Sequence, residues 1–88
     1  MKQATVTIQN KVGLHARPAA LIMAAVNKHC SGVRLEKSGK VVDLNGIVDI
    51  LKLQGGAGDE IVITCEGEDE EACLTALTEL FNSGFGEG

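Results

Sequence analysis

The residues with the clearest chemical potential lie in one short segment, Gly13-Leu14-His15-Ala16-Arg17-Pro18, which directly precedes a long apolar helical pattern. Proline is tolerated in the first turn of a helix because the N–H groups there have no intrahelical partner. The segment is therefore typical of a loop that ends at a helix N-terminus. Such an end carries N–H donors and a partial positive charge, so it favours an anion.

His15 and Arg17 could together handle a phosphate. A neutral histidine offers a nucleophilic nitrogen near pH 7, and a phosphoryl group on that nitrogen leaves far more readily than one on serine or threonine. Arg17 would supply a fixed charge with forked donors, and the backbone N–H groups of Ala16 and Arg17 would add further donors. The segment alone leaves three interpretations open: a covalent phosphohistidine, a non-covalent phosphate site, or a loop histidine beside a surface arginine.

The composition indicates a small folded domain. The chain has 88 residues, and 44% of them are hydrophobic, so we expect one domain over 1–88 with a modest core. Phe81 and Phe85 are its only aromatic residues, and it has no tryptophan or tyrosine. The core must therefore be built mostly from aliphatic side chains.

Charge and hydropathy exclude several classes of protein. The net charge is −4, and the sequence has no basic cluster or aromatic platform, so we expect no nucleic-acid partner. It has no signal-peptide pattern and no run of about 18 apolar residues, so we expect no membrane insertion. Cys30, Cys65 and Cys73 lack the spacing of a zinc or redox motif. They indicate free thiols in a reducing cytoplasm, without a metal or cofactor, and at least two should pack as small hydrophobes.

Hydrophobic periodicity predicts the order β-α-β-β-α-β-α. Strands are expected at 4–8, 33–37, 40–44 and 60–66, with a two-residue turn at Ser38-Gly39. Helices are expected from Pro18 to a stop at Gly32, over 47–53, and from the acidic run 68–71 to a stop at Gly84. Because each strand has one apolar face, the helices should cover one side of an antiparallel sheet. The predicted fold is an α+β open-faced two-layer sandwich, with four strands and three helices.

Two apolar stripes should face this core. The stripe on the first helix comprises Ala19, Ile22, Met23 and Val26. Lys28 and His29 follow in the last turn of that helix, where positive charge suits the helix dipole. The stripe on the last helix comprises Cys73, Ala76, Leu77, Leu80 and Phe81. Other apolar residues lie outside these stripes and either complete the core or form an exposed docking patch. The residues of this possible patch are Leu21, Ile47, Val48 and Leu51.

The segment from Gly13 to Ala19 resembles the signature of the HPr family, the histidine phosphocarriers of the phosphoenolpyruvate:sugar phosphotransferase system. The resemblance extends over essentially the whole chain. It implies that His15 accepts a phosphoryl group on Nδ1 from phosphorylated Enzyme I and passes it to a IIA protein, while Arg17 helps to neutralise it. It also favours transient docking of these partners through the apolar patch. The oligomeric state stays open, with a monomer as the default expectation.

A second family signature differs in this chain. Many members of the family have a regulatory serine at the start of the middle helix, whereas this sequence has Gly46 there and Asp49 three residues later. Glycine has no hydroxyl, so we expect no serine-based regulation, with His15 as the only phosphorylation site within the system. Two other roles within the family stay open: a carrier of the regulatory nitrogen-type branch, and a regulatory binding module. A free-standing enzyme with His15 as general base is disfavoured, because no acidic residue lies near His15 in the sequence.

Overall fold

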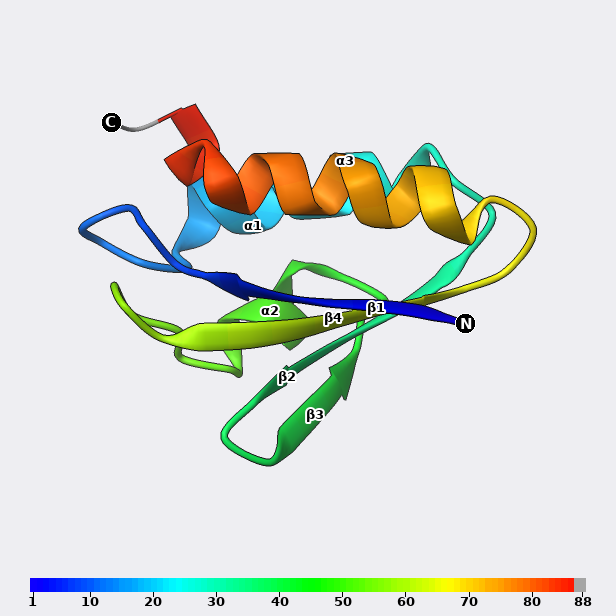
Figure 1. Ribbon diagram of the computed structural model, residues 1–88. Coiled ribbons are helices and arrows are strands. Elements are labelled where there is room, and N and C mark those ends of the chain that lie inside the picture. Colours follow the sequence, from blue (N-terminus) through cyan, green and yellow to red (C-terminus); the bar gives the residue numbers. More distant parts are fainter. Residues whose placement is uncertain (87–88) are drawn as a thin grey trace.

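The computed structural model describes residues 1–86 and has the predicted order of elements (Figure 1). Four strands and three α-helices are followed by a short 3₁₀ turn, Gly84–Gly86. The strands are β1 (Lys2–Thr7), β2 (Gly32–Lys37), β3 (Lys40–Asp43) and β4 (Glu60–Glu66). The helices are α1 (Ala16–Asn27), α2 (Ile47–Leu51) and α3 (Glu70–Asn82).

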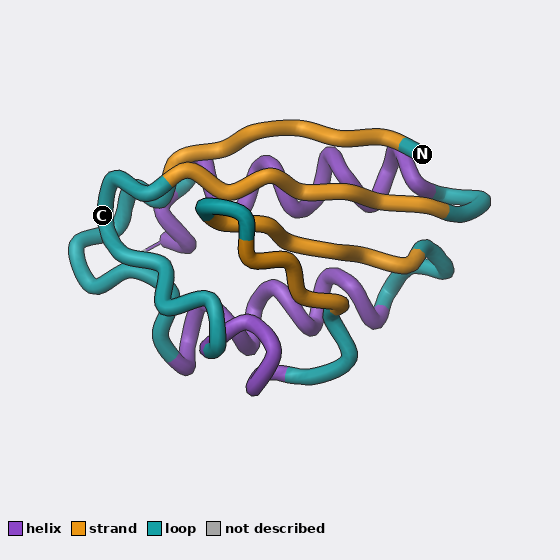
Figure 2. The backbone as a smooth tube through the Cα atoms, turned by 90° about the horizontal axis from the view of Figure 1, so that it is seen from below, coloured by secondary structure: helices purple, strands orange, loops and turns teal. Residues whose placement is uncertain are grey.

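The sheet has the strand order β1-β4-β2-β3, and every neighbouring pair is antiparallel. Helices α1 and α3 lie side by side across one face, and α2 packs against α1 and β3 (Figure 1). Figure 2 looks onto the other face of the sheet, with α1 and α3 behind the strands. The predicted open-faced sandwich is confirmed. No helix among residues 1–86 is long and apolar enough to cross a membrane.

The core lies between the sheet and the helices. Strand residues Ile61, Ile63 and Leu35 are fully buried there, as alternation predicts. The stripe predicted for α1 is confirmed, because all four of its members are buried. The stripe of α3 is confirmed only in part: Cys73, Leu77 and Phe81 are buried, whereas Ala76 and Leu80 are half-buried because they line the groove between α1 and α3.

The predicted stop at Gly32 is wrong. Helix α1 ends at Asn27, and Gly32 is instead the first residue of β2. The connection needs no glycine in a left-handed conformation, because the Asp69 carboxylate accepts hydrogen bonds from the N–H of Cys30 and the hydroxyl of Ser31. The prediction that Lys28 and His29 lie in the last turn is wrong, because α1 ends at Asn27, Lys28 is the C-cap and His29 follows it, with Nδ1 2.8 Å from the Ala25 carbonyl oxygen.

The predicted turns at Ser38-Gly39 and at Gly84 are confirmed. Ser38 and Gly39 both have positive φ, which suits the two-residue turn of a hairpin. Gly84 has φ +64°, and the Phe85 ring packs edge-to-face on Phe81 at 4.9 Å between centroids. This contact packs the turn after α3 against the hydrophobic core.

The cysteines divide as expected into two buried thiols and one exposed thiol. Cys65 on β4 and Cys73 on α3 are fully buried, whereas Cys30 is exposed. Burial, together with the nearby Cys73 thiol, raises the pKa of Cys65 to about 12. Both buried thiols are therefore packed as small apolar groups rather than poised as nucleophiles.

Candidate functional site

His15 lies at the junction of a loop and a helix. It is the N-cap of α1, with extended backbone, and its side chain makes no capping hydrogen bond. Its carbonyl accepts the N–H of Ala19 at 3.0 Å, which starts the helix two residues earlier than the predicted start at Pro18. The residue is half-buried, and no acidic residue lies in the first turn. The imidazole is therefore placed where a helix presents its positive end.

The loop before His15 is held by backbone contacts. The Asn10 side-chain amide donates to the Gly13 carbonyl at 2.8 Å, and the Gly13 N–H donates back to the Asn10 carbonyl at 3.2 Å. Gly13 has φ +81°, a conformation that favours glycine. The next N–H, of the buried Leu14, donates to the Gly55 carbonyl at 2.9 Å. The backbone that leads into His15 thus has a defined path.

The Arg17 side chain has a hydrogen-bond partner that the sequence did not indicate. It is exposed, and its Nη1 donates to the Phe85 carbonyl at 3.0 Å. Phe85 is 68 residues away in the sequence, in the turn after α3. Sequence reasoning missed this contact, because only the fold brings the start of α1 beside the end of α3. The contact keeps the guanidinium at the same end of the molecule as His15.

The first turn of α1 offers a small set of donors for an anion. Pro18 has no N–H, so the backbone donors of this turn belong to Ala16 and Arg17, as predicted. Ala16 is exposed. A half-buried imidazole, a neighbouring guanidinium and a helix N-terminus together suit a phosphate that is bound covalently or non-covalently.

Known proteins share both this fold and this sequence pattern. The family described as "PTS HPr component phosphorylation site" matches residues 2–83. This chain belongs to the PTS HPr family. It is 35% identical over 88 residues to the phosphocarrier protein HPr of Cupriavidus necator, and the match covers 100% of this chain and 99% of the relative.

Two further relatives extend the likeness to HPr proteins. The HPr-like protein Crh of Bacillus subtilis is 40% identical over 77 residues, with 88% of this chain and 91% of that protein covered. The crystal structure of HPr-C-His from Thermoanaerobacter tengcongensis superposes with a TM-score of 0.94 at 42% identity. It covers 100% of this chain and 99% of that one. The resemblance inferred from Gly13 to Ala19 is confirmed at the level of the family.

The apolar residues suggested for docking in this HPr-family chain are largely exposed. On α2, Val48 is 64% exposed, Ile47 39% and Leu51 38%, whereas Ile50 is buried. Leu21 on α1 is half-buried and packs against the core. The helices α1 and α2 are in contact, so these side chains belong to adjoining elements. The alternative that they complete the core is wrong for the three exposed residues of α2 and partly right for Leu21.

Gly46, which the resemblance matches with the family's regulatory serine, is the N-cap of α2. The Asp49 carboxylate accepts the N–H groups of both Asn45 and Gly46 at 3.0 Å. A Cβ atom at Gly46 would meet nothing within 4 Å, so space does not exclude a serine there. The missing hydroxyl, rather than the shape of the site, is what removes a phosphate acceptor.

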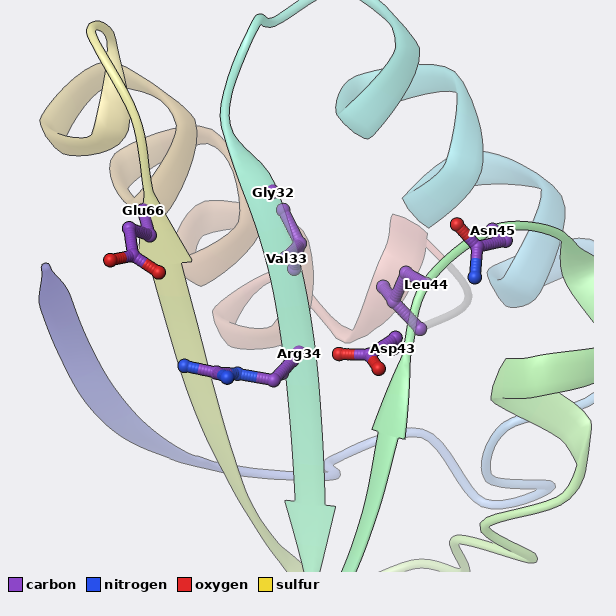
Figure 3. A pocket seen from close by; sticks show the side chains of 7 residues that line it. All are labelled: Gly32, Val33, Arg34, Asp43, Leu44, Asn45 and Glu66. Carbon is purple, nitrogen blue, oxygen red and sulfur yellow. The ribbon is translucent and has the colours of Figure 1, made fainter.

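A separate pocket lies at the start of β2, at the opposite end of this strand from the Ser38-Gly39 turn (Figure 3). Its volume is about 350 Å³, and Arg34 lies among the acidic side chains Asp43 and Glu66 on the neighbouring strands. None of the predicted site residues lines it. This pocket is therefore separate from the candidate site.

Proposed function

We propose that this protein is a phosphocarrier in which His15 accepts a phosphoryl group from phosphorylated Enzyme I and passes it to a IIA protein for sugar uptake. The observation that carries the proposal is the position of His15 at the N-cap of α1, two residues before Arg17 in the first turn of that helix. Membership of the HPr family supports the same role.

The transfer needs a nucleophile and charge neutralisation more than elaborate catalytic groups. Nδ1 of His15 attacks the phosphorus atom, and the new N–P bond forms as the bond to the donor breaks. Arg17 neutralises the phosphoryl charge, and the N–H groups of Ala16 and Arg17 donate to its oxygens. The return step to the IIA protein reverses these changes on His15.

Partner docking is assigned to the exposed apolar surface beside this site. This surface is formed by Leu21, Ile47, Val48 and Leu51, and the last three are partly or largely exposed. A carrier must leave each partner quickly, so a small interface at the weak end of the usual range suits the role. We expect a cytoplasmic monomer that meets Enzyme I and the IIA protein in turn.

Two related roles are the alternatives. The likeness to the HPr-like protein Crh favours a regulatory binding module of the same fold. The absence of a serine at position 46 favours a chain outside serine-kinase control, such as a carrier of the regulatory nitrogen-type branch. The presence of both His15 and Arg17 favours transfer over a purely regulatory role, and the identity of the IIA acceptor separates the two branches.

The proposal is tested by incubating the protein with phosphoenolpyruvate and Enzyme I and measuring an acid-labile mass increase. We expect the wild type to gain one phosphoryl group, His15→Ala to gain none, and Arg17→Ala to fold normally but react more slowly. A wild type that stays unmodified would contradict the carrier role. A label that persists in His15→Ala would place the acceptor elsewhere. Challenging the labelled protein with sugar-type and nitrogen-type IIA proteins then identifies the branch.

A further inference from the structure

The His15 loop rests directly on a second loop, residues 54–59, which joins α2 to β4. The Leu14 N–H donates to the Gly55 carbonyl at 2.9 Å. A Cβ atom on Gly13 would lie 2.4 Å from that same oxygen and 2.9 Å from the Cα of Gly56. Backbone meets backbone here with no space for a methyl group, so the path of loop 54–59 dictates the path of the chain into His15.

Lys37, near the end of β2, holds loop 54–59 from outside. Its Nζ donates to the Leu53 carbonyl at 3.3 Å and to the Gln54 carbonyl at 3.0 Å. These two carbonyls belong to the peptide groups on either side of the Gln54 Cα, and Gln54 has φ +53°. Residues with a side chain rarely adopt this left-handed conformation. One ammonium bound to both carbonyls holds them on the same side, as that conformation requires.

Asp59 holds loop 54–59 from within, through contacts with both the loop backbone and Lys37. Its carboxylate accepts the Gly56 N–H at 2.8 Å and lies 3.4 Å from the Lys37 ammonium. The Gly56 hydrogen bond, followed by the Lys37 ammonium, holds the pKa of this carboxyl below its ordinary value. A continuous set of contacts thus runs from the Lys37 ammonium through loop 54–59 to the Gly55 carbonyl, and from there to the N–H of Leu14, next to His15.

We propose that Lys37 is a positioning residue for His15. By fixing loop 54–59 it fixes the Gly55 carbonyl that holds Leu14, and so it sets the angle at which the imidazole meets a phosphoryl donor. This role rests on the proposed phosphocarrier function. Lys37 is separate from the docking residues Leu21, Ile47, Val48 and Leu51, so its loss should slow the transfer step without weakening partner binding. Small displacements of a reacting group can slow a reaction by up to ~100-fold, which makes such an effect measurable.

The test compares Lys37→Met with Lys40→Met in phosphorylation by Enzyme I. Lys40 is the matched control, because it lies in the same hairpin and its ammonium also donates to a backbone carbonyl, that of Lys52, outside loop 54–59. For Lys37→Met we expect kcat to fall roughly tenfold while KM for the carrier stays within about twofold of wild type. Lys40→Met should change neither constant by more than about twofold, and Lys37→Arg should restore most of the loss because it keeps the charge.

Amide hydrogen exchange at Leu14 provides a second measurement that does not depend on phosphorylation. We expect Leu14 protection to fall in Lys37→Met and to stay at the wild-type level in Lys40→Met. Should Lys37→Met fail to fold, Asp59→Asn replaces it, since it removes the ion pair at nearly constant volume. Unchanged kcat and unchanged Leu14 protection in the folded variant would overturn the proposal. A wild type that takes no phosphoryl group would contradict the carrier function instead, while the exchange data still report whether Lys37 orders the His15 loop.

Discussion

Helices α1 and α3 lie side by side, but their N-termini lie at opposite ends of the molecule and are built differently (Figure 1). The N-caps of α1 and α3 are His15 and Asp69, and neither makes a side-chain capping hydrogen bond, but α1 has no acidic residue in its first turn. Helix α3 begins at Asp69 and carries Glu70 and Glu71 in its first turn. The short helix α2 resembles α3, because Asp49 accepts the N–H groups at its start.

The difference supports the proposal that the start of α1 binds an anionic group. Every helix N-terminus attracts negative charge, and a nearby carboxylate normally stabilises it. In α2 and α3 the chain supplies that carboxylate itself. At α1 it supplies a histidine and, two residues later, an arginine, and these residue types suit the binding of an anion. The chain that leads into α1 is held by loop 54–59 through the backbone, because the Gly55 carbonyl accepts the Leu14 N–H.

The largest expected effect comes from breaking that backbone support. In Gly13→Ala the new Cβ atom meets the Gly55 oxygen and the Gly56 Cα, neither of which can move cheaply, and the left-handed backbone is strained as well. We expect the free energy of unfolding to fall by about 3 kcal/mol, measured by urea denaturation.

The matched control is Gly39→Ala. Gly39 has almost the same conformation, φ +85°, but its Cβ atom would meet nothing within 4 Å. The loss there should be only the conformational strain, about 1 kcal/mol. Equal losses at Gly13 and Gly39 would show that the contact between the two loops adds nothing to the stability of the start of α1.

The second effect is on transfer rather than folding. Ala16→Asp places a carboxylate in the first turn of α1 and makes this helix start resemble that of α3. The added charge competes with an incoming phosphoryl group for the positive helix end, and a difference of about 1.4 kcal/mol corresponds to about tenfold in rate. We therefore expect phosphorylation by Enzyme I to slow about tenfold, with stability unchanged or slightly raised.

Ala72→Asp is the control for that substitution. Ala72 is also exposed and also lies in a first turn, but in α3, whose start lies at the opposite end of the molecule from the start of α1 (Figure 1). The variant carries the same net charge as Ala16→Asp, so a general electrostatic effect would slow both proteins alike. Normal transfer in Ala72→Asp together with slow transfer in Ala16→Asp would locate the effect at the start of α1.

Local sequence patterns predicted where the helices start, but they predicted the contacts between distant segments poorly. The proline after His15-Ala16-Arg17, the Asn45-Gly46 cap with Asp49, and the acidic run at 68–71 each carry their signal within a few residues. The strand alternation and the Ser38-Gly39 turn are equally local. These features were enough to predict the architecture and the place of His15.

The contacts that hold the site depend on the fold and left little trace in the sequence. Nothing near Arg17 indicates that it donates to Phe85, and nothing near Gly55 or Gly56 indicates what these glycines pack against. The close approach of Gly55 and Gly56 to Gly13 is a property of the folded chain. The wrong stop at Gly32 has the same origin, because the Asp69 carboxylate that ends the α1 connection lies 39 residues away from Cys30.

The smallest expected effect concerns the acidic start of α3 at low pH. The Ser31 hydroxyl, and after it the Cys30 N–H, hold the pKa of Asp69 below its ordinary value of 3.8. A carboxyl whose pKa is lower in the folded than in the unfolded chain stabilises the fold above the unfolded pKa, and this contribution is lost as pH falls through the folded pKa. Asp69→Asn should therefore be less stable than wild type at pH 7, and the difference should shrink as pH falls below about 4. Urea denaturation at several pH values measures this, with Glu68→Gln as the control because Glu68 is an exposed carboxylate one residue earlier. A stability difference for Asp69→Asn that stays constant from pH 7 to pH 2 would mean that the amide fails to replace the carboxylate for reasons of shape rather than charge, and the electrostatic contrast between α3 and α1 would then be wrong.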